Sequence, residues 1–172
     1  VMLKVLGHDH PDVASAYSNM ANVHLQQGQY AKALQLYTQS LEIMRKVEGT
    51  EHLGLALLYN NMAGAHLKQG EYARALELLE QSLEINLKVH GPEHVDVASI
   101  YHNMAYVHSQ QGHCTRALEL HTKSLEIKLK VYGPDHPDVA RVYSGMGKEH
   151  NFQGQYARAL ELYTQSLEIK LK

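Results

Sequence analysis

The chain has 172 residues, of which 44% are hydrophobic and 20% are charged, and its 16 basic and 18 acidic residues nearly cancel. This balance argues against nucleic acid or an anionic membrane surface as the partner, and no stretch approaches the roughly 18 apolar residues of a membrane helix. Because Cys114 is the one cysteine, an intramolecular disulfide is excluded and a cytoplasmic location is expected.

The sequence repeats every 42 residues in register over the whole chain. Four columns of identical residues show the period: Gly7, Gly49, Gly91 and Gly133; Tyr17, Tyr59, Tyr101 and Tyr143; Gly28, Gly70, Gly112 and Gly154; Ser40, Ser82, Ser124 and Ser166. The period predicts a remnant of a preceding repeat (1–6) and four repeats (7–48, 49–90, 91–132 and 133–172) in one solenoid domain. Because the chain starts and stops inside a repeat, we expect it to be a segment of a longer array or an array without the polar terminal repeats that normally cap a solenoid.

In the first copy, a helix is predicted to begin at His10-Pro11-Asp12. Proline fits the first helical position, and an aspartate in the first turn suits the positive end of the helix dipole. Apolar side chains then follow on one face through Ala14, Tyr17 and Ala21, and Gly28 marks the turn that ends the helix.

A second helix is predicted from about Tyr30 to Val47. It carries one stripe through Ala33 and Tyr37 and another through Leu36 and Ile43. A helix with two apolar stripes packs on two sides, here against its partner helix and against the next repeat. Stacked copies therefore bury a continuous core, as in solenoids.

The later copies follow this plan with two departures. The second copy begins with His52-Leu53-Gly54 and lacks the proline and aspartate, so we expect a less firmly set first turn. The fourth copy has Gly145 and Gly147 inside its first helix, where each glycine costs about 0.5–1 kcal/mol relative to alanine.

The string Asn19-Met20-Ala21, followed by Gly28-x-Tyr30-x-x-Ala33 and Tyr37, resembles the tetratricopeptide repeat. The 42-residue form, with LGHDHPDVA before the first helix and SLEI in the second, is similar to the repeats of kinesin light chains. The resemblance implies an all-α fold, a right-handed superhelical solenoid of antiparallel helix pairs. It also implies a protein-binding function, with acidic peptides as ligands in the concave groove lined by the first helix of each repeat.

Thirteen histidines raise the question of metal or catalytic chemistry. Eight recur once per copy, in columns that start at His10 and His24, and such recurrence indicates a structural role. The second column lies on the apolar face of the first helix, so we expect it to be buried and neutral, and stability to fall in mild acid. Its members are His24, His66, His108 and His150.

Three further residues, His113, Cys114 and His121, break the repeat. A zinc site takes four ligands, and no second cysteine or acidic partner stands near these three. No phosphate-binding loop and no catalytic motif appears in the sequence. We therefore predict no enzyme activity, no cofactor and no metal.

A third face of the first helix varies between copies while the core columns stay constant. Its amides offer donors and acceptors to a peptide backbone, and its cations without acidic neighbours predict an extended, acidic peptide as the ligand. An alternative explanation is random sequence change on a solvent-exposed face without a function, which would produce the same variation. The candidate residues are Asn19, Asn22, Leu57, Asn60, Asn61, Lys68, His102, Asn103, Tyr106, Arg141 and Lys148.

Two alternatives remain open at this point. The chain ends expose apolar side chains that would join copies into a head-to-tail homo-oligomer, which makes a structural self-assembly module the second hypothesis. A regulatory repeat segment of a larger signalling protein is the third. The apolar end residues are Val1, Leu3, Val5 and Leu6 at one end, and Leu167, Ile169 and Leu171 at the other.

Overall fold

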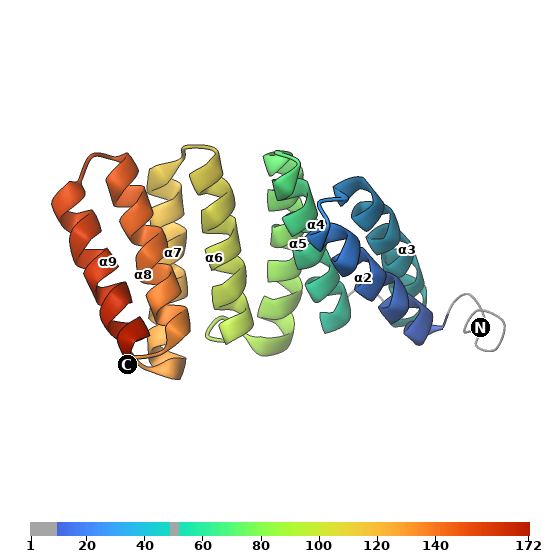
Figure 1. The fold of residues 1–172 in the computed structure, drawn as a ribbon. Helices are drawn as coiled ribbons and strands as arrows, with labels where there is room; N and C mark the ends of the chain where they lie inside the picture. The colour runs from blue at the N-terminus through green and yellow to red at the C-terminus, as the bar shows by residue number, and fades with distance from the viewer. Residues whose placement is uncertain (1–9, 49–51) are drawn as a thin grey trace. The chain divides into compact units, whose positions relative to one another are not determined.

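The computed structural model describes residues 10–48 and 52–172, and all the regular structure in them is α-helical (Figure 1). The helices are α2 (Pro11–Gln26), α3 (Tyr30–Glu48), α4 (Leu53–Lys68), α5 (Tyr72–His90), α6 (Val95–Gln110), α7 (Cys114–Tyr132), α8 (Pro137–Phe152) and α9 (Tyr156–Leu171). They belong to two compact units, residues 1–89 and 90–172, with His90 as the first residue of the second. The predicted all-α class and the helix pairs are confirmed.

A histidine caps the first helix of each copy. The backbone N–H of the residue two positions on donates to the histidine Nδ1, and so satisfies one of the N–H groups that a helix start leaves without a partner. The four bonds are Asp12 to His10 at 3.2 Å, Gly54 to His52 at 3.1 Å, Asp96 to His94 at 3.2 Å and Asp138 to His136 at 3.1 Å. The second copy therefore keeps the cap although it lacks the proline and aspartate.

The turn inside each helix pair depends on glycine. Gly28 has φ = +74°, in the left-handed region that a side chain disfavours, and Gly70, Gly112 and Gly154 have φ of +78°, +77° and +74°. The repeated glycine column thus ends the first helix at the same place in every copy.

Three members of the second histidine column, His24, His66 and His150, close this turn instead of filling the core. Nδ1 of His24 lies 2.8 Å from Oε1 of Gln29, and the column is only partly buried. The equivalent contacts join His66 to Glu71 and His150 to Gln155, both at 2.5 Å. Our expectation that this column is buried is wrong, because its helix face opens onto the turn, where a polar side chain five residues on offers a partner.

Small residues and a buried serine hold the two helices of a pair together. Ala14 and Ala33 are both buried, which brings the α2 and α3 backbones close. Ser40 then donates its hydroxyl to the carbonyl oxygen of Ala14 at 2.8 Å, a bond worth about 1 kcal/mol net. The bond recurs from Ser82 to Ala56 and from Ser166 to Ala140, each at 2.7 Å.

The last helix leaves much of its apolar surface exposed. Leu167 and Leu171 are 55% and 77% exposed, as expected, whereas Ile169 is partly buried. The other predicted apolar end, residues 1–6, lies outside the described residues. None of the helices in the described part of the chain combines the length and apolar character that crossing a bilayer requires.

Candidate ligand-binding faces

In the first unit, the predicted binding residues lie on α2 and α4, which contact each other. We call this set the α2/α4 face: Asn19, Asn22, Leu57, Asn60, Asn61 and Lys68. Asn19 and Lys68 are exposed, and Leu57 is 63% exposed. Asn22 is already engaged, because its Oδ1 accepts a hydrogen bond from the Tyr37 hydroxyl at 2.5 Å. Its amide therefore supports the core of the pair as well as the face.

In the second unit, the predicted residues lie on α6 and α8. We call this set the α6/α8 face: His102, Asn103, Tyr106, Arg141 and Lys148. The Lys148 ammonium lies 5.4 Å from the ring centroid of Tyr106 and 5.3 Å from that of Phe152. Both rings are exposed, at 42% and 58%, so they present a cation between two aromatic surfaces to solvent.

Phe152 also belongs to the variable face predicted for the first helix of the fourth copy, although it was not one of the candidate binding residues named above. A signal for it exists in the repeat, because a large aromatic side chain stands where the other copies have Gln26, Lys68 and Gln110. The structure shows what the Phe152 ring contacts, which is the Lys148 ammonium one helical turn earlier.

The α6/α8 face is less positive than the sequence suggests, because Arg141 forms an ion pair with Asp138 one turn before it. Burial raises the pKa of Asp138, but the hydrogen bond from Arg141 and the charge of Lys128 outweigh burial and hold that pKa below its ordinary value. The Arg141 side chain is nevertheless 66% exposed, and a guanidinium has five N–H donors, so donors are left for a ligand carboxylate.

His102 packs inward against His121 instead of lying open on the face. The two rings lie 5.1 Å apart between centroids, and His121 is only 2% exposed. Burial, reinforced by nearby positive charges, lowers the pKa of His121 to about 3 and that of His102 to about 4. Neither Nδ1 has a hydrogen-bond partner among the described residues, and both rings are neutral at pH 7.

Gly145 makes room for His121. A Cβ atom at this position would lie 2.7 Å from both Cε1 and Nε2 of the His121 ring. The other copies have Asn19, Asn61 and Asn103 at the position of Gly145. Gly145, which the sequence analysis counted as destabilising for its helix, is thus required by packing. His121 and Gly145 both depart from the repeat, and the two departures belong together.

The residues considered for a zinc site, His113, Cys114 and His121, face different partners. His113 lies against His108 with 5.9 Å between ring centroids, and His121 faces His102. Burial and a hydrogen bond with the buried Glu149 raise the pKa of the Cys114 thiol. These contacts explain the irregular residues by packing inside the second unit.

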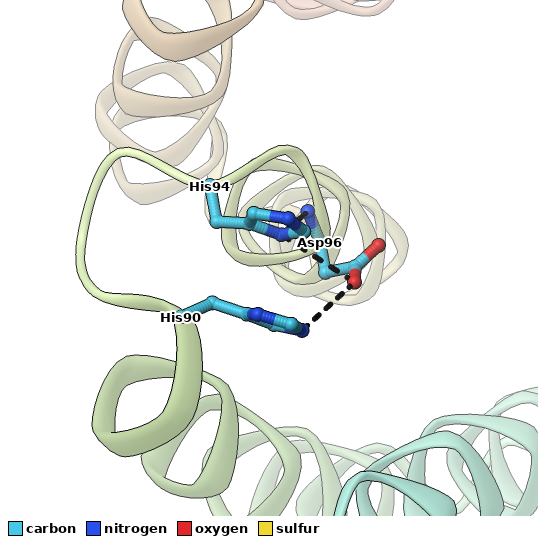
Figure 2. A group of neighbouring side chains, drawn as sticks. All are labelled: His90, His94 and Asp96. Atoms are coloured by element: carbon cyan, nitrogen blue, oxygen red, sulfur yellow. Dashed lines mark hydrogen bonds and ion pairs between the residues drawn. The ribbon is translucent and has the colours of Figure 1, made fainter.

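Metal-ligating side chains do gather at another place in the described residues. His90, His94 and Asp96 bring one ligand atom each to within 4.8 Å of one another (Figure 2). The sequence signal is His90, which breaks the repeat by standing where the next copy has Tyr132. In the sequence, His94 belongs to a repeated histidine column and was therefore assigned a structural role. For this reason the group of three metal-ligating residues was not predicted.

The tetratricopeptide repeat family matches residues 1–46, 12–88, 54–130 and 96–172, which together cover the chain. The chain belongs to the tetratricopeptide repeat (TPR) family. Members of this family serve as protein-interaction scaffolds. Because the family match includes the second unit, its irregular residues are variations on a TPR core.

One solved structure supports the resemblance to kinesin light chains, and two more distant ones share the fold. A kinesin-light-chain-like protein of Podosopora anserina with nearly identical TPR-like repeats has a TM-score of 0.79 at 26% identity, over 98% of this chain and 80% of that chain. BtubC (BKLC) from P. vanneervenii gives 0.85 at 22% identity, over 94% of this chain and 65% of that chain. MamA gives 0.65 at 18% identity, over 98% and 82%. The comparison with curated protein sequences gave no match.

Proposed function

We propose that this TPR chain binds an extended, acidic peptide segment of a partner protein on the first helices of its repeats. The observation that carries the proposal is the exposed group formed by Tyr106, Lys148 and Phe152 on the α6/α8 face. An ammonium between two exposed rings offers charge and apolar contact at the same point, which suits an acidic residue followed by an apolar or aromatic one.

The other residues of each face fit a ligand of the same chemical class. Arg141 has donors left for a second carboxylate, and the α2/α4 face offers an exposed cation, Lys68, and an exposed apolar side chain, Leu57, at separate points of α4. We expect micromolar affinity, because a flexible peptide loses conformational entropy on docking. The proposal includes the repeats 7–48, 49–90, 91–132 and 133–172 as the interacting units, and a cytoplasmic setting.

Reversing the charge at Lys148 tests the site. We expect Lys148→Glu to weaken binding of a short acidic peptide about tenfold, or about 1.4 kcal/mol, because it replaces attraction by repulsion at the centre of the face. The probes are fluorescently labelled synthetic peptides that contain Glu, Asp and Trp, compared with peptides of the same length in which Gln and Asn replace the acids. Anisotropy titrations give the affinities.

The matched control is Arg116→Glu, which reverses an exposed cation on α7, away from the α6/α8 face. We expect it to leave the affinity unchanged. If both variants weaken binding equally, the peptide responds to net charge alone and the proposed site is wrong. If wild type binds acidic and neutral peptides equally, the proposed ligand class is wrong.

End-to-end assembly is the second candidate, and the surface of α9 favours it. Leu160 and Leu167 are 66% and 55% exposed, whereas the equivalent Leu118 and Leu125 of α7 are partly buried where α8 packs on that helix. A second copy would cover α9 in the way that α8 covers α7. We expect light scattering to show a mass that rises with concentration for wild type and stays monomeric for Leu160→Glu. A monomeric wild type at high concentration would exclude this function.

A further inference from the structure

His90, His94 and Asp96 form a compact group where α5 ends and α6 begins (Figure 2). Nε2 of His90 lies 3.6 Å from Oδ2 of Asp96, and Nδ1 of His94 lies 3.4 Å from the same oxygen. The two imidazole rings stack with 3.9 Å between centroids and 13° between planes. We propose that this group binds a divalent transition-metal ion of the Zn²⁺ class.

The ligand set suits such an ion. Imidazole nitrogen and carboxylate oxygen bind Zn²⁺ at about 2.0–2.2 Å, so small side-chain rotations of His90 and Asp96 complete the contacts. Two histidines and one carboxylate leave a fourth position for water or for a ligand atom of a partner. The single carboxylate charge offsets half the charge of the ion.

The helix cap prepares His94 for this role. Its Nδ1 accepts the backbone N–H of Asp96 at 3.2 Å, so this nitrogen carries a lone pair and the proton sits on Nε2. The same lone pair faces the Asp96 carboxylate, at 3.4 Å, and would bind the ion in place of the long cap bond. The tautomer that coordination needs is therefore the one that the fold already selects.

The next junction of the chain shows which features are specific to this site. Tyr132 stacks on His136 there with 4.0 Å between centroids and 15° between planes, so ring stacking belongs to the repeat and needs no metal. Tyrosine offers no imidazole nitrogen, however, and Asp138 is held by Arg141. At the proposed site histidine replaces tyrosine, and Ser99 stands where Arg141 would be.

Asp96 is correspondingly available for coordination. Within the described part of the chain, the ionisable side chains beside its carboxylate are the rings of His90 and His94, at 3.6 Å and 3.4 Å. The three side chains are 25%, 38% and 56% exposed in the order His90, His94, Asp96, so an ion reaches them from solvent without any opening of the fold.

The decisive comparison is Zn²⁺ binding by wild type and by His90→Tyr, measured by competition with a chromophoric chelator. The variant copies Tyr132 and so keeps the stack and the fold, while the remaining histidines contribute equally to both proteins. We expect the tightest Zn²⁺ equivalent of wild type to weaken by at least about tenfold, as metal sites do when a supporting group is lost. Asp96→Asn, which removes the charge and keeps the shape, should weaken the same equivalent.

A gain-of-function variant tests sufficiency. Tyr132→His combined with Arg141→Ser recreates the ligand set at the next junction, and we expect it to bind one further equivalent of Zn²⁺. Equal Zn²⁺ affinity and stoichiometry in wild type, H90Y and D96N would overturn the proposal. A double variant that folds, as circular dichroism reports, and gains no equivalent would equally contradict the assigned geometry.

Discussion

Substitution of Gly145 by alanine should destabilise the second unit by about 1–3 kcal/mol, the cost of overpacking a filled interior. Inside a helix this substitution normally stabilises by up to about 1 kcal/mol. Here the new Cβ would lie 2.7 Å from the His121 ring. The ring has little room to move, since it is 2% exposed and packed against His102. Urea denaturation followed by circular dichroism measures the change.

Two variants separate the clash from the general effect of losing a glycine. Gly64 also lies inside a first helix, but a Cβ there meets no atom within 4 Å, so Gly64→Ala should stabilise by about 1 kcal/mol. His121→Leu takes the residue of the second copy, Leu79, and should remove most of the penalty of Gly145→Ala. A double-mutant cycle without coupling between positions 121 and 145 would show that the two residues do not constrain each other.

Acid should destabilise the second unit through His102 and His121. Burial and surrounding positive charge lower their pKa values to about 4 and about 3, whereas histidine in an unfolded chain titrates near about 6.5. Between these values the unfolded chain binds more protons than the folded one, so the contribution to stability is fully present above about pH 6.5 and is lost as the pH falls toward 3. The loss at pH 5 is on the order of 2 kcal/mol for each histidine.

The charged groups around the pair act in opposite directions. Lys128 and Arg141 disfavour protonation of His102. His102 itself, followed by Lys128 and Lys148, disfavours protonation of His121. Asp138 favours protonation of His102, but it is the weakest of these influences. Together with burial, the three cations therefore keep both rings neutral, and the direction of the pH effect follows from them.

The test compares denaturation midpoints at pH 7.5 and pH 5. The variant His102→Asn with His121→Leu takes both residues from the second copy, which has Asn60 and Leu79 at these positions, and should lose much of the pH dependence. His113→Gln is the control, because Gln29 and Gln155 stand at the equivalent positions and His113 is exposed. A drop in midpoint that is as large in the double variant as in wild type would assign acid sensitivity to other groups.

The repeat in the sequence was enough to predict the helices. Helix starts at Pro11 and Tyr30 and the turn at Gly28 are local consequences of capping, apolar spacing and a positive φ, so they recur in every copy. The second helix ends at Glu48, one residue beyond the predicted Val47. The TPR family also follows from this local pattern, because the pattern specifies which faces must be buried.

Only the tertiary structure explains the residues that depart from the repeat. His121 and Gly145 lie on different repeats, and only the packing of α7 on α8 shows that one makes room for the other. The sequence predicted that the histidine column of His24 is buried, because periodicity identifies the helix face on which a residue lies. Periodicity does not show that this face is partly exposed to solvent near the turn. In this protein the sequence by itself determined the repeated architecture, whose causes are local. The tertiary structure decided which irregular side chains meet, since those contacts join helices of neighbouring repeats.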